Sequence, residues 1–210
     1  MAKNTKEETT KSVNVNSHWA VYKDKWDMAS LLNLKYEQCE LVYSMLKPPT
    51  VDALSGEYHG YNPFYVHVRR GQMENNPFVT VDFLGKAFRR NPLGNGMEGD
   101  GYIIWRADGA IVRNAPFGWY IGPSVIDGKD ALCMTWKAFD DPESKEYGYD
   151  EVREAAPGLY LCITVNPLSR PDEPVAGRPN YWIIGDKAGE WVGPDHEFPL
   201  SNYSVEKKSE

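Results

Sequence analysis

Apolar residues recur at helical spacing along one stretch of the chain, residues 27–46. One face of this stretch carries Met28, Leu31, Leu32, Cys39, Val42, Tyr43 and Leu46. Asp27 can cap the first turn, and Pro48 ends the helix because proline cannot continue its hydrogen-bond ladder. We therefore expect one amphipathic helix that packs on a sheet, plugs the end of a barrel or forms a dimer surface.

After Pro49 the apolar and polar residues alternate, which is the period of β-strands. The segments with strand character are residues 54–61, 64–69, 78–88, 102–106, 110–113, 117–121, 131–139, 159–165, 181–184 and 190–192. Asp108 and Gly109 lie between two of them and favour a two-residue hairpin turn, which needs positive φ. No helical pattern separates consecutive segments, which argues against a parallel α/β sheet.

These segments, joined by turns, predict a mainly β chain whose eight or nine strands fold as a single antiparallel up-and-down β-barrel, with some segments joined or left outside the sheet. Closing the sheet removes its exposed edges, and about eight strands leave an interior that can hold one small ligand. The length of 210 residues suits one such domain. We expect it to span residues 18–203, with polar, disordered tails at 1–17 and 204–210.

Composition excludes several classes of protein. The formal net charge is −7 and no run of Lys and Arg interleaves with aromatic residues, which argues against nucleic-acid binding. The chain lacks an apolar run of the ~20 residues that span a bilayer, and residues 1–17 lack the apolar core of a secretory signal. The three cysteines are an odd, widely spaced set that forms no disulfide framework or metal cluster. We therefore expect a cytoplasmic protein with no metal and no cofactor.

Three segments give the chain a resemblance to lipocalin-like bacterial proteins. Those proteins carry Gly-Lys-x-Phe, Asp-Gly-Lys and Asp-Glu-x-Arg followed by Pro-Gly-Leu-Tyr-Leu-Gly. The corresponding residues here are Gly85-Lys86-Ala87-Phe88, Asp127-Gly128-Lys129, Asp150-Glu151-Val152-Arg153 and Pro157-Gly158-Leu159-Tyr160-Leu161. In addition, Gly56-Glu57-Tyr58 resembles the Gly-x-Trp opening of lipocalins and other calycins, with Tyr58 in the Trp place.

This resemblance covers residues 54–165 and implies a barrel, but no agreed activity. The chain departs from the pattern at Cys162, where the other proteins have Gly. The signatures of hydrolases, nucleotide-binding loops and zinc proteases are absent from the sequence.

Four residues are candidates for catalysis: Tyr58, His59, Lys86 and Arg153. Lys86 either faces solvent together with Asp82 or lies in a polar strip inside the barrel. A lysine in an apolar pocket can act as a base or form a Schiff base. Arg153 either makes a surface ion pair or a bridge that closes the barrel wall, or it points inward and binds a carboxylate, enolate or carbonyl oxygen.

Further residues are candidates for ligand binding, because aromatic rings offer flat apolar area with polar handles. They are His67, Trp105, Arg106, Trp119, Tyr120, Trp136, Tyr160 and Trp182. The same aromatic residues also suit an ordinary core, so both interpretations stand. His59, His67 and Glu57 could form a metal site on neighbouring strands, but their spacing does not support one.

Three hypotheses for function follow from these features. In the first, the barrel binds a lipophilic metabolite and acts as a cofactor-independent isomerase, cyclase or lyase through acid and base side chains. In the second, it is a non-catalytic carrier of a fatty acid, terpenoid, haem or pigment. In the third, it is an oligomeric scaffold, such as a homodimer, that uses the helix at 27–46 as its interface.

Overall fold

The computed structural model describes residues 26–63, 81–144, 147–165 and 179–205. The expected strand at 64–69, the candidate His67 and the expected tail at 1–17 lie outside these described residues.

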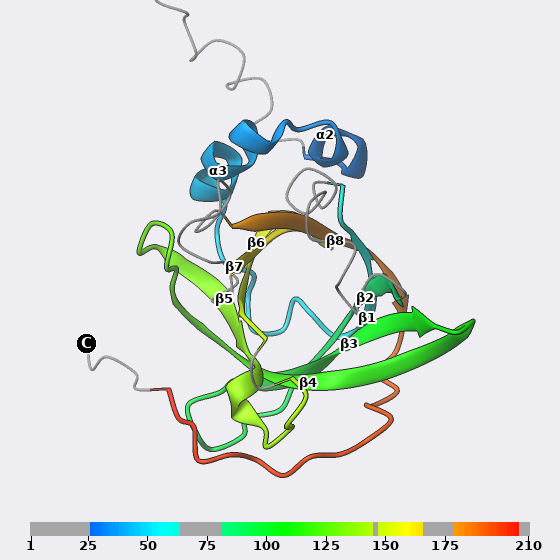
Figure 1. The fold of residues 1–210 in the computed structure, drawn as a ribbon. Helices are drawn as coiled ribbons and strands as arrows, with labels where there is room; N and C mark the ends of the chain where they lie inside the picture. The colour runs from blue at the N-terminus through cyan, green and yellow to red at the C-terminus, as the bar shows by residue number, and fades with distance from the viewer. Residues whose placement is uncertain (1–25, 64–80, 145–146, 166–178, 206–210) are drawn as a thin grey trace, which may run out of the picture.

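Eight strands follow one another around a closed barrel, each antiparallel to the next, and β1 pairs with β8 to complete the ring (Figure 1). The strands are β1 (Gly56–Tyr61), β2 (Val81–Arg90), β3 (Gly99–Ala107), β4 (Ala110–Pro123), β5 (Asp130–Thr135), β6 (Tyr149–Ala156), β7 (Leu159–Val165) and β8 (Asn180–Gly189). This order confirms the predicted antiparallel up-and-down barrel.

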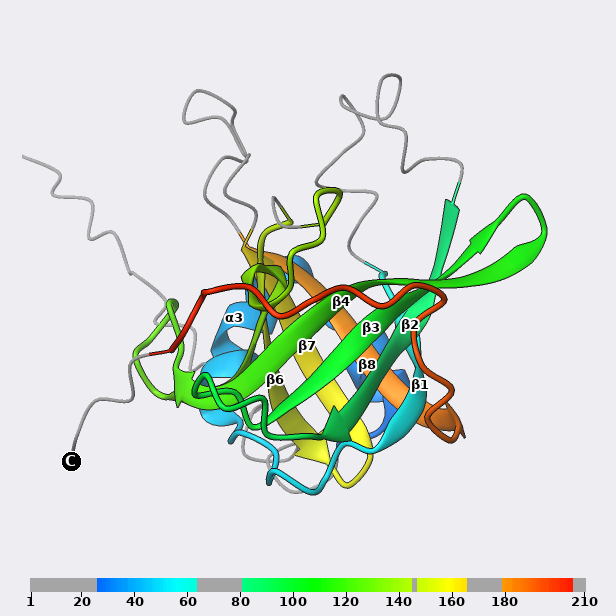
Figure 2. The same ribbon diagram turned by 90° about the horizontal axis from the view of Figure 1, so that it is seen from below.

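The hairpin between β3 and β4 forms at the predicted place. Asp108 and Gly109 have φ values of 50° and 81°, as a two-residue turn of this kind needs. The hairpin extends beyond the barrel wall (Figure 2). β4 is one long strand that joins two of the expected segments, with an irregularity at Ala115, whose φ is 52°.

β4 is bordered differently along its two halves. It pairs with β3 from Ala110 to Trp119, but with β5 only from Gly118 to Pro123. In the first half, Arg113 instead exchanges two hydrogen bonds with Asp195 of the C-terminal segment. Its backbone N–H donates to Asp195 Oδ2 and its carbonyl accepts from the Asp195 N–H, both at 2.7 Å.

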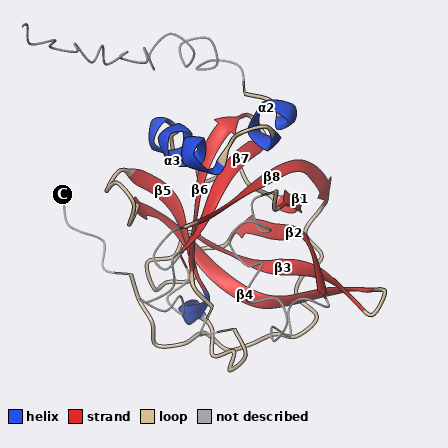
Figure 3. Cartoon of the chain, turned by 45° about the horizontal axis from the view of Figure 1, so that its top comes forward, coloured by secondary structure: helices blue, strands red, loops and turns tan. Residues whose placement is uncertain are grey.

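The expected single helix is two helices, α2 (Met28–Leu32) and α3 (Tyr36–Met45). Asn33 ends α2, because its side-chain amide donates to the Ala29 carbonyl at 2.8 Å and competes with the backbone ladder. Both helices lie outside the barrel, beside β7 and β8 (Figure 3). The apolar cluster between them includes Leu31, Cys39, Val42, Tyr43, Leu159, Leu161, Ile163, Tyr181 and Ile183.

Three further expectations differ from the structure. β6 is a strand that the apolar pattern does not predict. The segment at 131–139 leaves the sheet after Thr135, whose hydroxyl accepts a hydrogen bond from the Lys137 N–H and caps a 3₁₀ turn, η3 (Trp136–Ala138). Residues 190–192 form no strand.

The barrel interior is filled by a second apolar cluster that is rich in aromatic rings. Its buried members include Leu54, Tyr58, Phe88, Ile103, Phe117, Trp119, Leu132, Met134, Trp136, Val152, Tyr160, Cys162, Trp182 and Ile184. Residues paired across antiparallel strands share a face, so the register also assigns the interior positions. Val152 lies opposite Cys162, and Cys162 lies opposite Trp182.

Candidate functional site

Two charged side chains lie within this aromatic interior. Lys86 alternates with the core residue Phe88 on β2, and Asp150 alternates with the core residue Val152 on β6. Lys86 is 3% exposed and Asp150 is 2% exposed. The Lys86 Nζ donates to Asp150 Oδ2 at 2.6 Å, so the two form a buried ion pair. Of the two orientations considered for Lys86, the structure has the inward one.

Three aromatic rings surround the Lys86 ammonium. Its Nζ lies 4.5 Å from the ring centroid of Trp136, 4.9 Å from that of Trp182 and 5.3 Å from that of Phe117. A desolvated cation gains about 2 kcal/mol from the face of such a ring. The rings therefore help to hold a charge in a place that water barely reaches.

Hydrogen-bonding capacity is left over beside this pair. Asp150 Oδ1 and Trp182 Nε1 are buried and have no hydrogen-bond partner among the described residues. Two other indoles of the interior are satisfied, because Trp136 Nε1 donates to the Ala115 carbonyl and Trp119 Nε1 to the Asp100 carbonyl, each at 3.1 Å. A buried polar atom without a partner costs about 1–3 kcal/mol. Asp150 Oδ1 and Trp182 Nε1 are therefore the atoms at which a further polar group would be bound most favourably.

Two asparagines extend this polar region along the interior. Asn114 lies opposite Ile103 on β3, and Asn180 lies opposite Thr164 on β7. Their Oδ1 atoms are also buried and lack a partner among the residues described. Cys162 is fully buried nearby, and burial raises the pKa of its thiol well above the ordinary value. It is therefore a neutral, apolar part of the wall.

Tyr58 and Tyr160 both point into the barrel interior, as members of its apolar cluster. Their rings meet edge to face with centroids 6.3 Å apart. Both hydroxyls donate to the Ala53 carbonyl, at 3.4 Å from Tyr58 and 3.2 Å from Tyr160. Burial raises the pKa of Tyr160, so its phenol is a neutral donor. Both phenols therefore form hydrogen bonds to the backbone. Among the described residues, neither forms a hydrogen bond with Lys86 or Asp150.

A cavity of about 320 Å³ lies beside the first half of β4, the half that does not pair with β5. Its lining includes side chains of β4, of the segment after η3 and of the C-terminal segment, among them Asn114, Ala115, Asp141, Glu143, Ser144, Tyr147, Asp195 and His196. Lys86 and Asp150 do not line it, but a chain of ring contacts connects the two regions. Tyr147 lines the cavity and packs on Trp136 with centroids 5.8 Å apart, and Trp136 carries the Lys86 ammonium on its face.

The other candidate residues lie elsewhere. Trp105 is half-buried at the edge of the interior cluster and packs on Phe83, with ring centroids 5.7 Å apart. His59 and Arg106 are exposed. Tyr120 is half-buried on β4 between the core residues Trp119 and Ile121, and therefore faces outward. Burial raises the pKa of Tyr120 to about 12.

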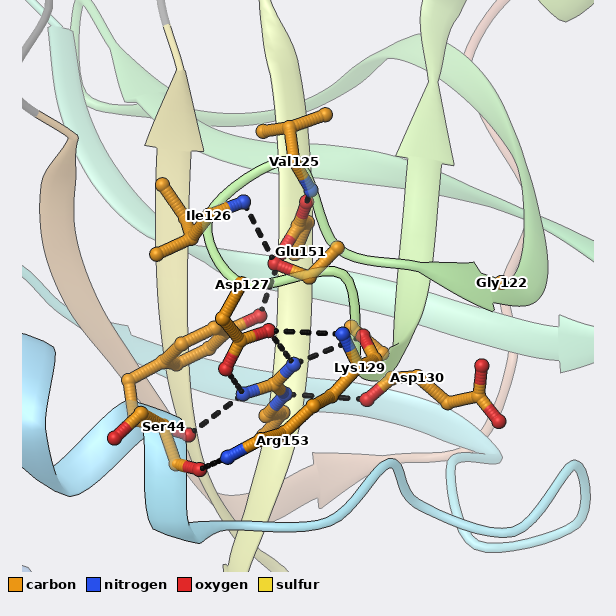
Figure 4. Close-up of polar contacts among 12 residues, drawn as sticks. Ser44, Gly122, Val125, Ile126, Asp127, Lys129, Asp130, Glu151 and Arg153 are labelled. Carbon is orange, nitrogen blue, oxygen red and sulfur yellow. Dashed lines mark hydrogen bonds and ion pairs between the residues drawn. The ribbon is translucent and has the colours of Figure 1, made fainter.

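Arg153 faces outward from β6, toward helix α3, so an inward orientation for this residue is wrong (Figure 4). It is 0% exposed, and all five N–H groups of its guanidinium donate. They bond both carboxylate oxygens of Asp127 and the carbonyls of Tyr43, Lys129 and Asp130, at 2.7–3.1 Å. The guanidinium also lies 4.4 Å from the ring centroid of Tyr43. These contacts match the alternative in which Arg153 closes the wall.

Glu151 adds to the same network outside the barrel. It accepts from the Tyr43 hydroxyl at 2.9 Å and from the Val125 N–H at 2.7 Å. Glu151 and Arg153 thus attach both helix α3 and the β4–β5 loop to β6.

The Asp127–Arg153 ion pair predicts a pH-dependent contribution to stability. The bond from Arg153 lowers the pKa of Asp127 below its ordinary value of 3.8. The stabilisation is therefore complete above the unfolded-state pKa and is lost as the pH falls through the lower folded-state pKa. Asp127→Asn should cost about 1–3 kcal/mol at pH 7, and progressively less below the ordinary pKa. Urea unfolding of the wild type and of Asp127→Asn, at about five pH values between about 2.5 and 7, measures the difference in their free energies of unfolding.

Asp52→Asn is the matched control, because Asp52 pairs with Arg90 at 3.0 Å with side chains 70% and 52% exposed. Such a surface pair contributes about 0–1 kcal/mol. A cost of Asp127→Asn that stayed the same across the pH range would contradict the role given to this ion pair.

Asp150 is the site residue that sequence reasoning missed. The signal was present, because Asp150 and Val152 share one parity, and Glu151 and Arg153 share the other. In the described part of the chain, no three His, Cys, Asp or Glu side chains are grouped to hold a metal ion. No helix of the described residues is both long and apolar enough to cross a membrane.

Comparisons with known proteins leave the site to be argued from the chain itself. No protein-family model matches the sequence, and no curated protein matches it. A solved structure described as "Crystal structure of protein from Thermomonospora curvata" is similar, with 16% sequence identity and a TM-score of 0.44. The match covers 80% of this chain and 93% of that one. A likeness of this degree carries no argument about function.

Proposed function

We propose that the chain binds a small lipophilic molecule inside its barrel, with the Lys86–Asp150 pair as the polar contact. The observation that carries this proposal is the buried ion pair itself, with Asp150 Oδ1 unpartnered and three aromatic rings around Lys86. Apolar side chains of similar volume are often as stable as a buried ion pair, or more so. A pair kept in such a place is therefore better explained by a ligand than by stability.

The resemblance to lipocalin-like proteins supports the same proposal. Lys86 lies in the Gly-Lys-x-Phe segment and Asp150 in the Asp-Glu-x-Arg segment, so two of the similar segments meet inside the barrel. An interior of about eight strands is just wide enough to be filled by side chains or to hold one small ligand, so a ligand beside the pair would replace part of the aromatic packing. The cavity beside Asn114 and Tyr147 is separated from the pair by the Trp136 ring, which packs on Tyr147 and contacts the Lys86 ammonium.

The pair also suits catalysis without a cofactor. A carboxylate beside an ammonium can accept a proton while the ammonium stabilises negative charge on a substrate oxygen. This is the chemistry of an isomerase, cyclase or lyase, with Asp150 as the base and Lys86 as the charge-stabilising group. In the carrier alternative, the same two groups only orient a bound terpenoid, fatty acid, haem or pigment.

The scaffold alternative loses its support. It relied on the apolar face of the helix at 27–46, and the core of that face, Cys39, Val42 and Tyr43, is buried against the barrel. The homodimer and the cytoplasmic location stay predictions.

A fluorescent apolar probe, 1-aminoanthracene, tests ligand binding directly. We expect it to bind with a Kd on the order of 10 μM and to quench tryptophan emission, because Trp136 and Trp182 face the interior. Trp182→Phe should weaken binding about threefold to tenfold, because it removes ring area and an N–H from the interior.

Tyr120→Phe is the control variant, since Tyr120 lies on the outer face of β4, and it should bind the probe like the wild type. Mass spectrometry of the denatured protein adds a second measurement, by detecting any lipophilic molecule that copurifies. No probe binding together with no copurified molecule would overturn the proposed function.

A further inference from the structure

The charges in the barrel interior limit the charge of the ligand. Lys86 and Asp150 neutralise each other at 2.6 Å. A carboxylate placed there would meet Asp150, and an ammonium would meet Lys86, so either would leave a net buried charge. Uncompensated buried charges are strongly unfavourable. The interior therefore selects a neutral molecule.

The unpartnered atoms limit the polar group of the ligand. Asp150 Oδ1 can only accept while the carboxylate is ionised, and Trp182 Nε1 can only donate. Lys86 also keeps N–H groups beyond the one that it gives to Asp150. A ligand group that satisfies both atoms must carry a donor and an acceptor.

The walls limit the rest of the molecule. Phe117, Trp136 and Trp182 all lie around the same ammonium, so a molecule that reaches the pair also meets aromatic rings. Flat rings pack on such rings by offset stacking or edge contacts, which add about 0.5–1.5 kcal/mol beyond the burial of area. A flat conjugated body therefore fits this site better than a flexible chain.

Resting on the proposed function, we propose that the ligand is a flat conjugated molecule whose polar end is a neutral donor–acceptor group, such as a carboxamide, lactam or enolised carbonyl. Its N–H or O–H donates to Asp150 Oδ1. Its oxygen accepts from Trp182 Nε1 or from Lys86. A simple ketone would leave Asp150 Oδ1 unpaired, and an alkane chain would leave both atoms unpaired.

A matched series of naphthalenes tests this proposal by displacement of 1-aminoanthracene from the wild-type protein. The series consists of 2-naphthamide, N,N-dimethyl-2-naphthamide, 2-naphthoate and 2-naphthylmethylamine. We expect 2-naphthamide to bind at least about tenfold more tightly than each of the others. The dimethyl compound lacks the donor, the naphthoate is an anion and the amine is a cation, so each lacks one required property.

Asp150→Asn should remove the advantage of 2-naphthamide over its dimethyl analogue. A carboxylate has two acceptor oxygens and an amide has one, so the oxygen bonded to Lys86 leaves no second acceptor for the ligand. The series on the wild type needs no variant, so the proposal stays testable if Asp150→Asn does not fold. Equal affinities for the four compounds, or tightest binding of the naphthoate or the amine, would overturn the proposal while leaving the proposed function intact. Absence of binding by 1-aminoanthracene would instead overturn the proposed function.

Discussion

Lys86→Met should lower the free energy of unfolding by about 3–5 kcal/mol, because it leaves the Asp150 carboxylate buried and unpaired. Met keeps most of the length and apolar volume of the lysine side chain. The loss is therefore attributable to the missing charge and to its contacts with Trp136 and Trp182. Urea unfolding followed by tryptophan fluorescence measures the change.

The double variant Lys86→Met/Asp150→Leu is the control for this prediction. Because it removes both charges, it should recover most of the stability and fall within about 1–2 kcal/mol of the wild type. The double variant should also lose the preference for 2-naphthamide, since neither charged partner remains. A double variant no more stable than Lys86→Met would show that the pair is not coupled as its geometry implies.

Arg153→Met should also lower the free energy of unfolding, by about 3–5 kcal/mol. It leaves Asp127 without its ion-pair partner and removes hydrogen bonds to three carbonyl groups. Arg153→Lys should retain part of the stability, since an ammonium keeps the charge but loses the planar fork that bonds both oxygens of Asp127. Thermal or urea unfolding of both variants measures these differences. Binding of 1-aminoanthracene to the folded fraction should not change, because Arg153 points away from the interior.

Arg113→Met provides a comparison with a more exposed pair. Arg113 donates to Glu57 at 2.7 Å, with side chains 21% and 11% exposed. We expect its loss to cost less than that of Arg153, about 1–2 kcal/mol. Arg153→Met as stable as Arg113→Met would contradict the structural role given to Arg153. A loss of probe affinity in folded Arg153→Lys would restore the view that it serves the ligand.

Local signals were enough to predict the barrel. Asp108-Gly109 predicts the β3–β4 hairpin, and the nearly continuous apolar run at 159–165 predicts β7, whose two faces are buried by the interior and by the helices. β6 was missed for the opposite reason. Its charged residues Asp150, Glu151 and Arg153 occupy both faces, so no apolar alternation is visible. Both faces are buried, one by the aromatic interior and the other by helix α3.

The site was only partly predictable. Lys86 was recognised as a residue with two orientations, but its partner Asp150 is 64 positions away, and only the closed barrel brings them together. The aromatic residues Trp136 and Trp182 were named as pocket candidates on composition. Which indole N–H lacks a partner depends on the backbone around it, and sequence patterns carry no information on that.

The segments 85–88, 127–129 and 150–153 meet at one strand, β6. They contribute two ion pairs to opposite faces of β6. Lys86 meets Asp150 inside the barrel, and Asp127 meets Arg153 outside it. One strand thus carries both the polar centre of the interior and the attachment of the helix.

The first half of β4 is held on its outer side by the Arg113–Asp195 bonds, whereas its second half is held by the ladder to β5. Two hydrogen bonds break at a smaller enthalpic cost than the whole set of hydrogen bonds between β4 and β5. The C-terminal segment at Asp195 therefore separates from β4 more readily than β5 does, and the 320 Å³ cavity lies between that segment and β4. Exchange of a molecule held in this cavity would then depend on a local opening of the C-terminal segment rather than on global unfolding. A substitution at the Arg113–Asp195 contact would then change the residence time of a molecule in the cavity without changing the free energy of global unfolding.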